Sequence, residues 1–363
     1  MIAERTGAMT GENAGRFMIY GATGYTGRLL ARLARDKGLS PIIAGRSEAK
    51  LKSLANQYEA EFRAFDLSDR KALDEALDDV DVVLHAAGPF SATSKPMVDA
   101  CLRTGTHYLD ITGEISVFEA CARRDEAAKE AGIMIMPGVG FDVVPSDCLA
   151  AHMKRRLPDA TDLVLGISGI GTASRGTSKT MIESIGAGTR VRRDGRIVSL
   201  GAAPQREMNF GDGNKPSVGV GWGDVSTAYH STGIPNITVY FEASPQLQQM
   251  ASIGGFMRFI LSRGFMQRRL KAKVDAEPDG PTEQERASGS SVLIGEASND
   301  TGEKVVSRLR TPEGYSLTIQ TGLDIVERVL AGEAKPGFQT PSTLLGPDFI
   351  TTFDGCVRED LNA

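Results

Sequence analysis

The chain has 363 residues, of which 41% are hydrophobic and 24% are charged, and its formal net charge is −5. This length predicts two domains, each large enough to bury its own core. The acidic balance argues against nucleic acid as a partner and gives no general attraction to anionic membranes. The four cysteines include no C-x-x-C pair, which argues against a disulfide framework and favours a cytoplasmic protein. No two of the four histidines have the spacing of metal ligands, which argues against a metal site.

The chain shows no sequence signal for membrane insertion or export. No stretch reaches the roughly 18 apolar residues that a spanning helix needs. Residues 1–14 lack the apolar core of a secretory signal, so we expect a flexible lead-in there.

The segment Phe17–Gly27 combines a buried strand with a glycine turn. Its first four residues are an apolar run typical of a parallel strand, and a helical pattern follows Gly27. The spacing G-x-x-G-x-x-G permits a tight turn, close approach of a pyrophosphate and close packing of helix on strand. The helix N-terminus then offers unpaired N–H groups to the phosphates. We therefore expect the whole turn to contact a dinucleotide: Gly21, Thr23, Gly24, Tyr25, Thr26 and Gly27.

The exit of the second strand, over 41–47, predicts which dinucleotide binds. An NAD-binding unit places Asp or Glu about 20 residues after the glycines, where it bonds the ribose 2′-hydroxyl. This chain instead has Arg46 and Ser47 there, with Lys50 one turn into the next helix. A guanidinium and a hydroxyl suit a 2′-phosphate, so the sequence favours NADP(H); the alternative is that Arg46 is a solvated loop residue. Asp66, at the end of the third strand, is a further expected cofactor contact.

The fourth strand, over 80–86, ends in a turn at the edge where open α/β sheets bind ligands. We expect this turn to pass close to the cofactor: Ala86, Ala87, Gly88, Pro89 and Phe90. Phe90 either stacks near the nicotinamide or packs in the core. His85, inside the apolar strand, is expected to be a core histidine.

Strands and helices alternate up to a sixth strand over 132–136, with a long helix expected at 115–131. This rhythm specifies a Rossmann-type doubly wound parallel sheet, here assigned to residues 15–140. A glycine-containing hinge at 137–146 follows, in which Asp142 or Ser146 could cap the next helix or Asp142 could face the cleft between domains.

From residue 161 the rhythm changes to strands joined by hairpins, including a D-G turn at 194–195. Residues 141–334 are therefore expected to form an α+β domain with a mostly antiparallel sheet, which binds substrate and mediates a homodimer. We expect a loop at 278–289 and a segment over 335–363 that returns to the first domain. The amphipathic, basic segment 250–274 is interpreted as a buried helix or subunit interface, with weak peripheral membrane contact as the alternative.

Several motifs resemble the saccharopine dehydrogenase-like NADP-binding oxidoreductases, and within them the trans-acting enoyl reductase branch. The matching segments are 21–27 (GATGYTG), 44–46 (AGR), 86–90 (AAGPF), 100–114 (ACLRTGTHYLDITGE), 140–147 (GFDVVPSD) and 340–346 (TPSTLLG). The resemblance implies a Rossmann domain, an inserted substrate and dimerisation domain, and a returning C-terminal segment. It also implies that the glycine turn and Arg46 contact the cofactor.

The candidate proton donors follow the fifth strand or lie at the hinge. Glu114, Asp142 and Tyr108 are the candidate catalytic residues; His107, Asp110 and Ser146 are neighbours, and Tyr229 and His230 are weaker candidates for substrate contacts. The sequence thus predicts an NADP(H)-dependent oxidoreductase that transfers hydride to or from an imine or an activated C=C bond of a small molecule. The alternative is a non-catalytic NADPH-binding regulatory protein.

Overall fold

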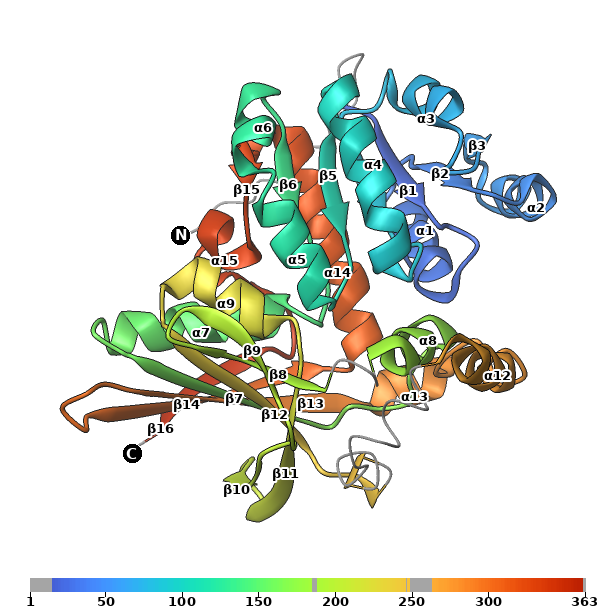
Figure 1. The fold of residues 1–363 in the computed structure, drawn as a ribbon. Coiled ribbons are helices and arrows are strands. Elements are labelled where there is room, and N and C mark those ends of the chain that lie inside the picture. The colour runs from blue at the N-terminus through green and yellow to red at the C-terminus, as the bar shows by residue number, and fades with distance from the viewer. Residues whose placement is uncertain (1–14, 185–187, 246, 249–262, 362–363) are drawn as a thin grey trace, which may run out of the picture.

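The computed structural model describes residues 15–184, 188–245, 247–248 and 263–361, so the predicted lead-in at 1–14 lies outside the described part. The described chain forms two sheets, one above the other in Figure 1. The first sheet is parallel and contains β1 (Phe17–Tyr20), β2 (Ile42–Gly45), β3 (Phe62–Ala64), β4 (Val82–His85), β5 (His107–Asp110), β6 (Met134–Met136) and β15 (Gly337–Phe338).

The first sheet is doubly wound, as predicted. Its strand order, β15-β6-β5-β4-β1-β2-β3, is that of a Rossmann fold with one strand added at the β6 edge. Alternate residues of β1 enter different cores: Phe17 and Ile19 pack on one face of the sheet, and Met18 and Tyr20 on the other. Both faces therefore need helices to cover them, which explains the continuous apolar run in this strand.

Helices from distant parts of the chain cover this sheet (Figure 1). The helices that alternate with its strands are α1 (Tyr25–Asp36), α2 (Glu48–Tyr58), α3 (Arg70–Leu77), α4 (Phe90–Thr104), α5 (Ile115–Ala122) and α6 (Asp125–Glu130). A much later helix, α14 (Gly314–Arg328), packs against α1 and β4. The expected second domain thus supplies part of the cover of the first sheet.

Within the described residues the second sheet has nine strands, and all but one of its strand pairs are antiparallel. Its strands are β7 (Asp162–Ser168), β8 (Thr189–Arg193), β9 (Arg196–Leu200), β10 (Gln205–Asn209), β11 (Asn214–Val220), β12 (Asn236–Glu242), β13 (Ser290–Ser298), β14 (Lys304–Pro312) and β16 (Val357–Leu361). β8 and β9 form the hairpin that the D-G turn predicted. Only β15 of the C-terminal segment joins the first sheet, because β16 pairs with β14 of the second.

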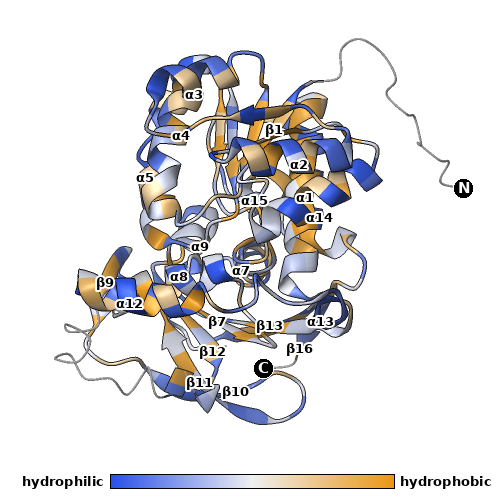
Figure 2. Cartoon of the chain, turned by 90° about the vertical axis from the view of Figure 1, so that its right-hand side faces the viewer, coloured by the Kyte–Doolittle hydropathy of each residue, from blue (hydrophilic) through white to orange (hydrophobic). Residues whose placement is uncertain are grey.

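The remaining helices are α7 (Val144–Arg156), α8 (Arg175–Ser184), α9 (Asp224–Thr232), α12 (Gly264–Val274), α13 (Glu283–Ser288) and α15 (Pro341–Leu345), with short turns η2 (Val329–Glu333) and η3 (Phe349–Thr352). α7 packs on β13 and β14 and α9 on β12, so both lie between the two sheets. One hydrophobic core runs from Ile19 and Leu84 of the first sheet to Leu163 and Leu293 of the second. Figure 2 shows the corresponding contrast between the hydrophobic strand β1 and the more hydrophilic outer helix α2.

Three predictions of local structure are wrong. The helix expected at 115–131 is two helices, because Arg124 leaves helical geometry and its guanidinium pairs with Asp99 of α4 at 2.9 Å. The loop expected at 278–289 contains α13, which begins with a capping box between Thr282 and Glu285. Neither Asp142 nor Ser146 caps α7, since Val143 occupies that position and the Ser146 hydroxyl donates to the Val143 carbonyl.

The amphipathic segment 250–274 lies partly outside the described residues. Its described part is α12, a basic helix with Phe265 61% exposed. Within the ranges that the structure describes, no helix combines the length and the apolarity needed to cross a bilayer.

Candidate active site

The glycine turn is packed so tightly that side chains larger than hydrogen would not fit at two of its positions. A Cβ at Gly27 would lie 2.2 Å from the Gly21 carbonyl oxygen, so this glycine allows α1 to pack against the turn. Gly21 has a φ of +89°, and a Cβ there would meet the backbone of Ala86 and Ala87 at 2.8 Å. The turn and the exit of β4 are therefore held together, as the Rossmann motif requires.

The N-terminus of α1 is free to bind an anion. Gly24 is the N-cap residue, no side chain caps the helix, and its first turn contains no acidic residue. The first N–H groups of a helix have no partner within it, so they point toward a phosphate placed at this turn. The structure thus provides the cradle that a dinucleotide pyrophosphate needs.

The side chain of Tyr25 is already engaged by the other domain. Its hydroxyl donates to the Pro281 carbonyl at 2.5 Å and accepts from Arg286 at 2.7 Å. The neighbouring Arg28 donates to the Thr23 carbonyl and pairs with Asp279 at 2.8 Å. Residues 279–286 therefore lie against the glycine turn, and the Tyr25 hydroxyl is engaged by them.

The exit of β2 presents the residues predicted to bind the 2′-phosphate. Arg46 and Lys50 are exposed, and among the described residues neither has an ion-pair partner. Ser47 is the N-cap residue of α2, and its hydroxyl makes no capping hydrogen bond. Asp66 accepts hydrogen bonds from the backbone and hydroxyl of Ser68, which lower the pKa of its carboxyl, as does the charge of Arg46 to a smaller extent. This donor set fits a phosphate rather than a free ribose hydroxyl.

Between the two sheets lies a cavity of about 480 Å³, bordered by the exits of β4 and β5. The predicted site residues that line it are Thr26, Ala86, Gly88, Phe90, Glu114 and Asp142. Residues of the second domain that were not predicted from the sequence also line it, among them Thr177, Arg190, Trp222 and Tyr315. Their local sequence does not identify these four residues, because only the fold brings together α8, β8, the loop before α9 and α14.

Phe90 packs in the core and also borders the cavity. It is 9% exposed, and its ring meets that of His85 edge-on at 5.4 Å. His85 is fully buried and shares a hydrogen bond with Thr93 at 3.0 Å, and burial lowers its pKa to about 3. His85 is therefore the neutral core histidine that was predicted.

Glu114 uses both carboxylate oxygens to hold the start of α4. They accept hydrogen bonds from the backbone N–H groups of Phe90 and Ser91 at 2.8 and 2.9 Å. An ionised carboxylate is stabilised at this position by the donors and by the helix dipole. Glu114 is thus suited to position the β4 exit rather than to give up a proton.

Asp142 lines the same cavity in a different environment, with its carboxyl so close to Gly113 that a Cβ there would lie 2.9 Å from Oδ2. Its backbone carbonyl accepts a hydrogen bond from the indole of Trp222 at 2.9 Å, but its carboxyl group has no hydrogen-bond partner among the described residues. Burial raises the pKa of this carboxyl to about 7. Asp142 is consequently present in both protonation states near neutral pH, as a general acid or base must be.

The structure does not bring Tyr108 to the cavity, which corrects its prediction as a catalytic residue. Tyr108 is fully buried, and its hydroxyl donates to Asp110 at 2.6 Å. Asp110 in turn accepts from the backbone of Thr112 and Gly138, so the pair ties β5 to the hinge. Burial raises the pKa of Asp110 to about 6, although these hydrogen bonds oppose the shift.

Tyr229 and His230 also lie away from the cavity lining. The Tyr229 ring stacks under the guanidinium of Arg192 at 4.0 Å, and His230 lies 3.6 Å from Glu119. Glu119 also accepts from Arg192 at 2.9 Å. These residues join α5 to β8 and α9, and they do not line this cavity.

Comparison with known proteins agrees with this geometry. Residues 17–136 match the family described as the saccharopine dehydrogenase NADP binding domain. The match covers about a third of the chain, from β1 to β6 of the first sheet. The resemblance drawn from the motifs is therefore confirmed for these residues, and NADP(H), predicted from Arg46, is the cofactor of this domain.

Relatives of this NADP binding domain carry several names. A trans-acting enoyl reductase of Mycobacterium leprae (strain TN) is 34% identical over 163 residues, 41% of this chain and 39% of that protein. A lipid droplet localized protein of Caenorhabditis elegans is 28% identical over 186 residues, 46% of this chain and 43% of that protein. A saccharopine dehydrogenase-like oxidoreductase of Mus musculus is 28% identical over 179 residues, 44% and 42% of the two chains. The chain thus spans between 39% and 43% of the length of these relatives.

The overall fold has a counterpart among solved structures. A saccharopine dehydrogenase (L-Glu forming) from Saccharomyces cerevisiae superposes with a TM-score of 0.63 and 12% identity, over 96% of this chain and 100% of that chain. This likeness confirms the predicted fold class, a Rossmann-type parallel sheet with a second α+β domain.

Proposed function

We propose that this protein is an NADP(H)-dependent oxidoreductase whose substrate is a small molecule with an activated C=C or C=N bond. The observation that carries the proposal is the carboxyl group of Asp142. It lies in the cavity beside the β4 exit, is free of hydrogen-bond partners among the described residues, and has a pKa near 7. Reduction of either bond needs a proton as well as a hydride, and this group can deliver it.

Different residues around the cavity would bind the cofactor and carry out the chemistry. When bound, NADPH supplies the hydride. The glycine turn and the N-terminus of α1 would hold its pyrophosphate, and Arg46 with Ser47 would hold the 2′-phosphate. Glu114 fixes the β4 exit, which forms one wall of the cavity. Asp142 donates its proton to the carbon or nitrogen of the substrate where negative charge develops.

Names of relatives support the C=C alternative without deciding it. Four similar mycobacterial proteins are named trans-acting enoyl reductases, and the matches cover less than half of each chain. The cavity, at about 480 Å³, has room for a medium-sized acceptor of either kind. We therefore keep the imine and the enoyl substrate as two forms of the same proposal.

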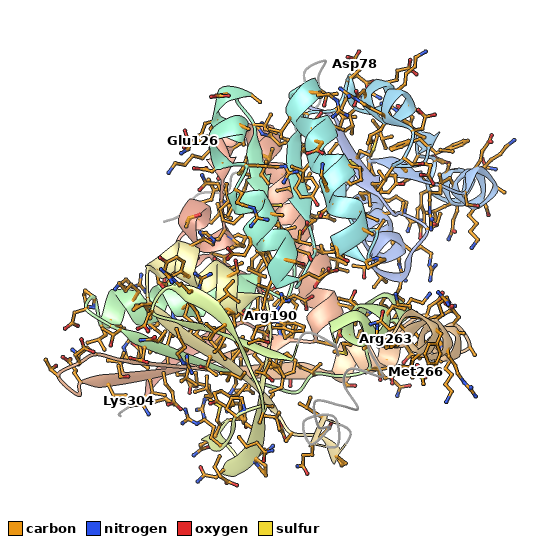
Figure 3. All side chains as sticks on the ribbon, viewed as in Figure 1. Asp78, Glu126, Arg190, Arg263, Met266 and Lys304 are labelled. Carbon is orange, nitrogen blue, oxygen red and sulfur yellow. The ribbon has the colours of Figure 1, made fainter. Side chains whose placement is uncertain are left out.

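Substitution of Asp142 tests the proposal. Asp142→Asn keeps the shape of the side chain but removes its titratable proton, so turnover should fall roughly 10²- to 10⁴-fold while the Kd for NADPH is unchanged. Loss of NADPH absorbance is followed with enoyl, imine and carbonyl acceptors, and NADPH affinity is measured by fluorescence titration. Asp78→Asn is the matched control, because Asp78 is an exposed residue at the end of α3, far from the cavity (Figure 3).

The same assay distinguishes the proposed enzyme from the alternative, a regulatory protein that binds NADPH without oxidising it. Under that alternative both the wild-type protein and Asp142→Asn bind NADPH, and neither oxidises it with any acceptor class. Equal turnover by wild-type protein and Asp142→Asn would retain an oxidoreductase but remove Asp142 as its proton donor.

A further inference from the structure

Residues 275–289 connect α12 to β13 and lie against the start of α1, and we call them the strap. They include α13, and Figure 1 shows α8, α12 and α13 grouped beneath α1. The glycine turn that the strap contacts is the cradle for the dinucleotide pyrophosphate described above. The reaction proposed above does not use the strap.

The first contact of the strap with α1 is the side chain of Tyr25. Its hydroxyl donates to the Pro281 carbonyl at 2.5 Å and accepts from Arg286 at 2.7 Å, and Arg286 also donates to that carbonyl at 3.0 Å. The backbone at Gly280 lies on the Tyr25 ring, because a Cβ there would be 2.8 to 2.9 Å from three ring atoms. The absence of a side chain at Gly280 therefore lets the strap approach the ring this closely.

The second contact is the carboxylate of Asp279. It accepts from Arg28 of α1 at 2.8 Å and pairs with Arg175 of α8, whose backbone N–H donates to the Asp279 carbonyl at 3.1 Å. Arg28 in turn donates to the Thr23 carbonyl of the glycine turn at 2.8 Å. One carboxylate therefore joins the strap to the glycine turn and to α8.

Apart from these contacts, the strap is mostly exposed. Pro281 is its one buried residue, and α13 contributes no residue to the core. A groove of about 270 Å³ lies between α13, α1 and α14. Exposed polar contacts each contribute little free energy, and a segment with few buried apolar contacts opens locally with little loss of stability. The strap can therefore leave the glycine turn while both sheets stay folded.

The residues that hold the strap also reach the cavity wall. The ring of Tyr25 meets that of Tyr315 edge-on at 5.1 Å, and the Tyr315 hydroxyl accepts from the backbone N–H of Ser174 at 2.7 Å. Tyr315 and Ser174 both line the cavity. The strap is thus in contact with the cradle at one end and is linked to the cavity through Tyr25 at the other.

We propose that the strap closes over bound NADP(H) and must open before the cofactor enters or leaves, so that its contacts at Tyr25 and Asp279 set the rate of cofactor exchange. This inference goes beyond the proposed function, because it concerns exchange of the cofactor and not the reaction. Opening breaks the hydrogen bonds of the Tyr25 hydroxyl and the ion pairs of Asp279, and it leaves both cores covered.

Stopped-flow fluorescence with NADPH measures both rates, and Asp279→Asn is the decisive variant. Release, followed by displacement with excess NADP⁺, should be roughly 3- to 10-fold faster than from the wild-type protein. Association should also be faster, so that the Kd changes less than either rate. Without a strap, the loss of a negative charge beside the cradle would strengthen NADPH binding and slow its release.

Two further variants separate the strap from charge and from general damage. Tyr25→Phe removes the hydrogen bonds of the other contact without altering charge, and it should also speed release. Glu277→Gln is the matched control, because it removes the same charge as Asp279→Asn from an exposed strap residue outside the two contacts. Both rates should stay at their wild-type values in this control, and thermal unfolding shows whether each variant is folded.

Limited digestion with trypsin tests closure in a second way. Cleavage after Arg286, followed by mass spectrometry, should be slowed by saturating NADP⁺ in the wild-type protein and slowed less in Asp279→Asn. Release from folded Asp279→Asn or Tyr25→Phe that is unchanged or slower, or cleavage that NADP⁺ does not slow, would overturn the inference. Neither measurement requires turnover, so a failure to oxidise NADPH with any acceptor would contradict the proposed function alone.

Discussion

Two carboxylates of one cavity show how local environment separates residues of the same chemical type. Glu114 is bound by two backbone N–H groups, whereas the carboxyl of Asp142 is buried without such donors. Burial without such donors favours the protonated form of Asp142 and raises its pKa to about 7. The sequence could name both residues, but it could not rank them, because the donors to Glu114 come from residues 24 and 23 positions earlier in the chain.

The charge of Arg46 should determine which of the two cofactors, NADPH or NADH, binds more tightly. Arg46→Glu places a carboxylate where the 2′-phosphate is expected, so the Kd for NADPH should rise roughly 10- to 100-fold. NADH has no phosphate there, and its affinity should be unchanged or improved, which makes it the internal control. Fluorescence titration with both cofactors measures the change. An unchanged ratio of the two affinities would show that Arg46 is only a solvated loop residue.

Among the helices, α4 depends on Glu114, the N-cap residue of α5, whose carboxylate accepts hydrogen bonds from the first residues of α4. Because its carboxylate binds the first N–H groups of that helix, Glu114→Gln should lower the free energy of unfolding by about 0.5–2 kcal/mol. Thermal denaturation measures the loss, and turnover should fall much less than in Asp142→Asn. A fully active, fully stable variant would remove the capping role, and a loss of turnover as large as that of Asp142→Asn would make Glu114 the proton donor.

The elements of the first sheet were largely predictable, and the reason is local. The apolar run of β1, the glycine turn and the start of α1 follow each other within 12 residues and depend on few distant contacts. The break between α5 and α6 was not predictable in this way, since Arg124 leaves the helix where it pairs with Asp99 of α4. The capping box of α13 is visible in the sequence as Thr282 and Glu285, but it lies in a polar, proline-containing stretch whose composition favours a loop.

At the scale of the whole molecule, the cavity exists only because the two sheets share one core. Thr26, Asp142, Arg190 and Tyr315 are far apart in the sequence, and α14 returns from the second half of the chain to pack on the first sheet. No pattern of spacing reveals such a meeting, so the cavity residues of the second domain could not be predicted. The homodimer, the cytoplasmic location and a membrane contact by segment 250–274 stay predictions.

The pH dependence of kcat/KM tests the central claim, that the proton comes from Asp142, most directly. Burial raises the pKa of this carboxyl to about 7, and only its protonated form can donate. With an acceptor that the wild-type protein reduces, kcat/KM should be high below pH 7 and fall about tenfold per unit above it, and Asp142→Asn should lack this break. A profile that is flat to about pH 9, or the same break in Asp142→Asn, would contradict the claim.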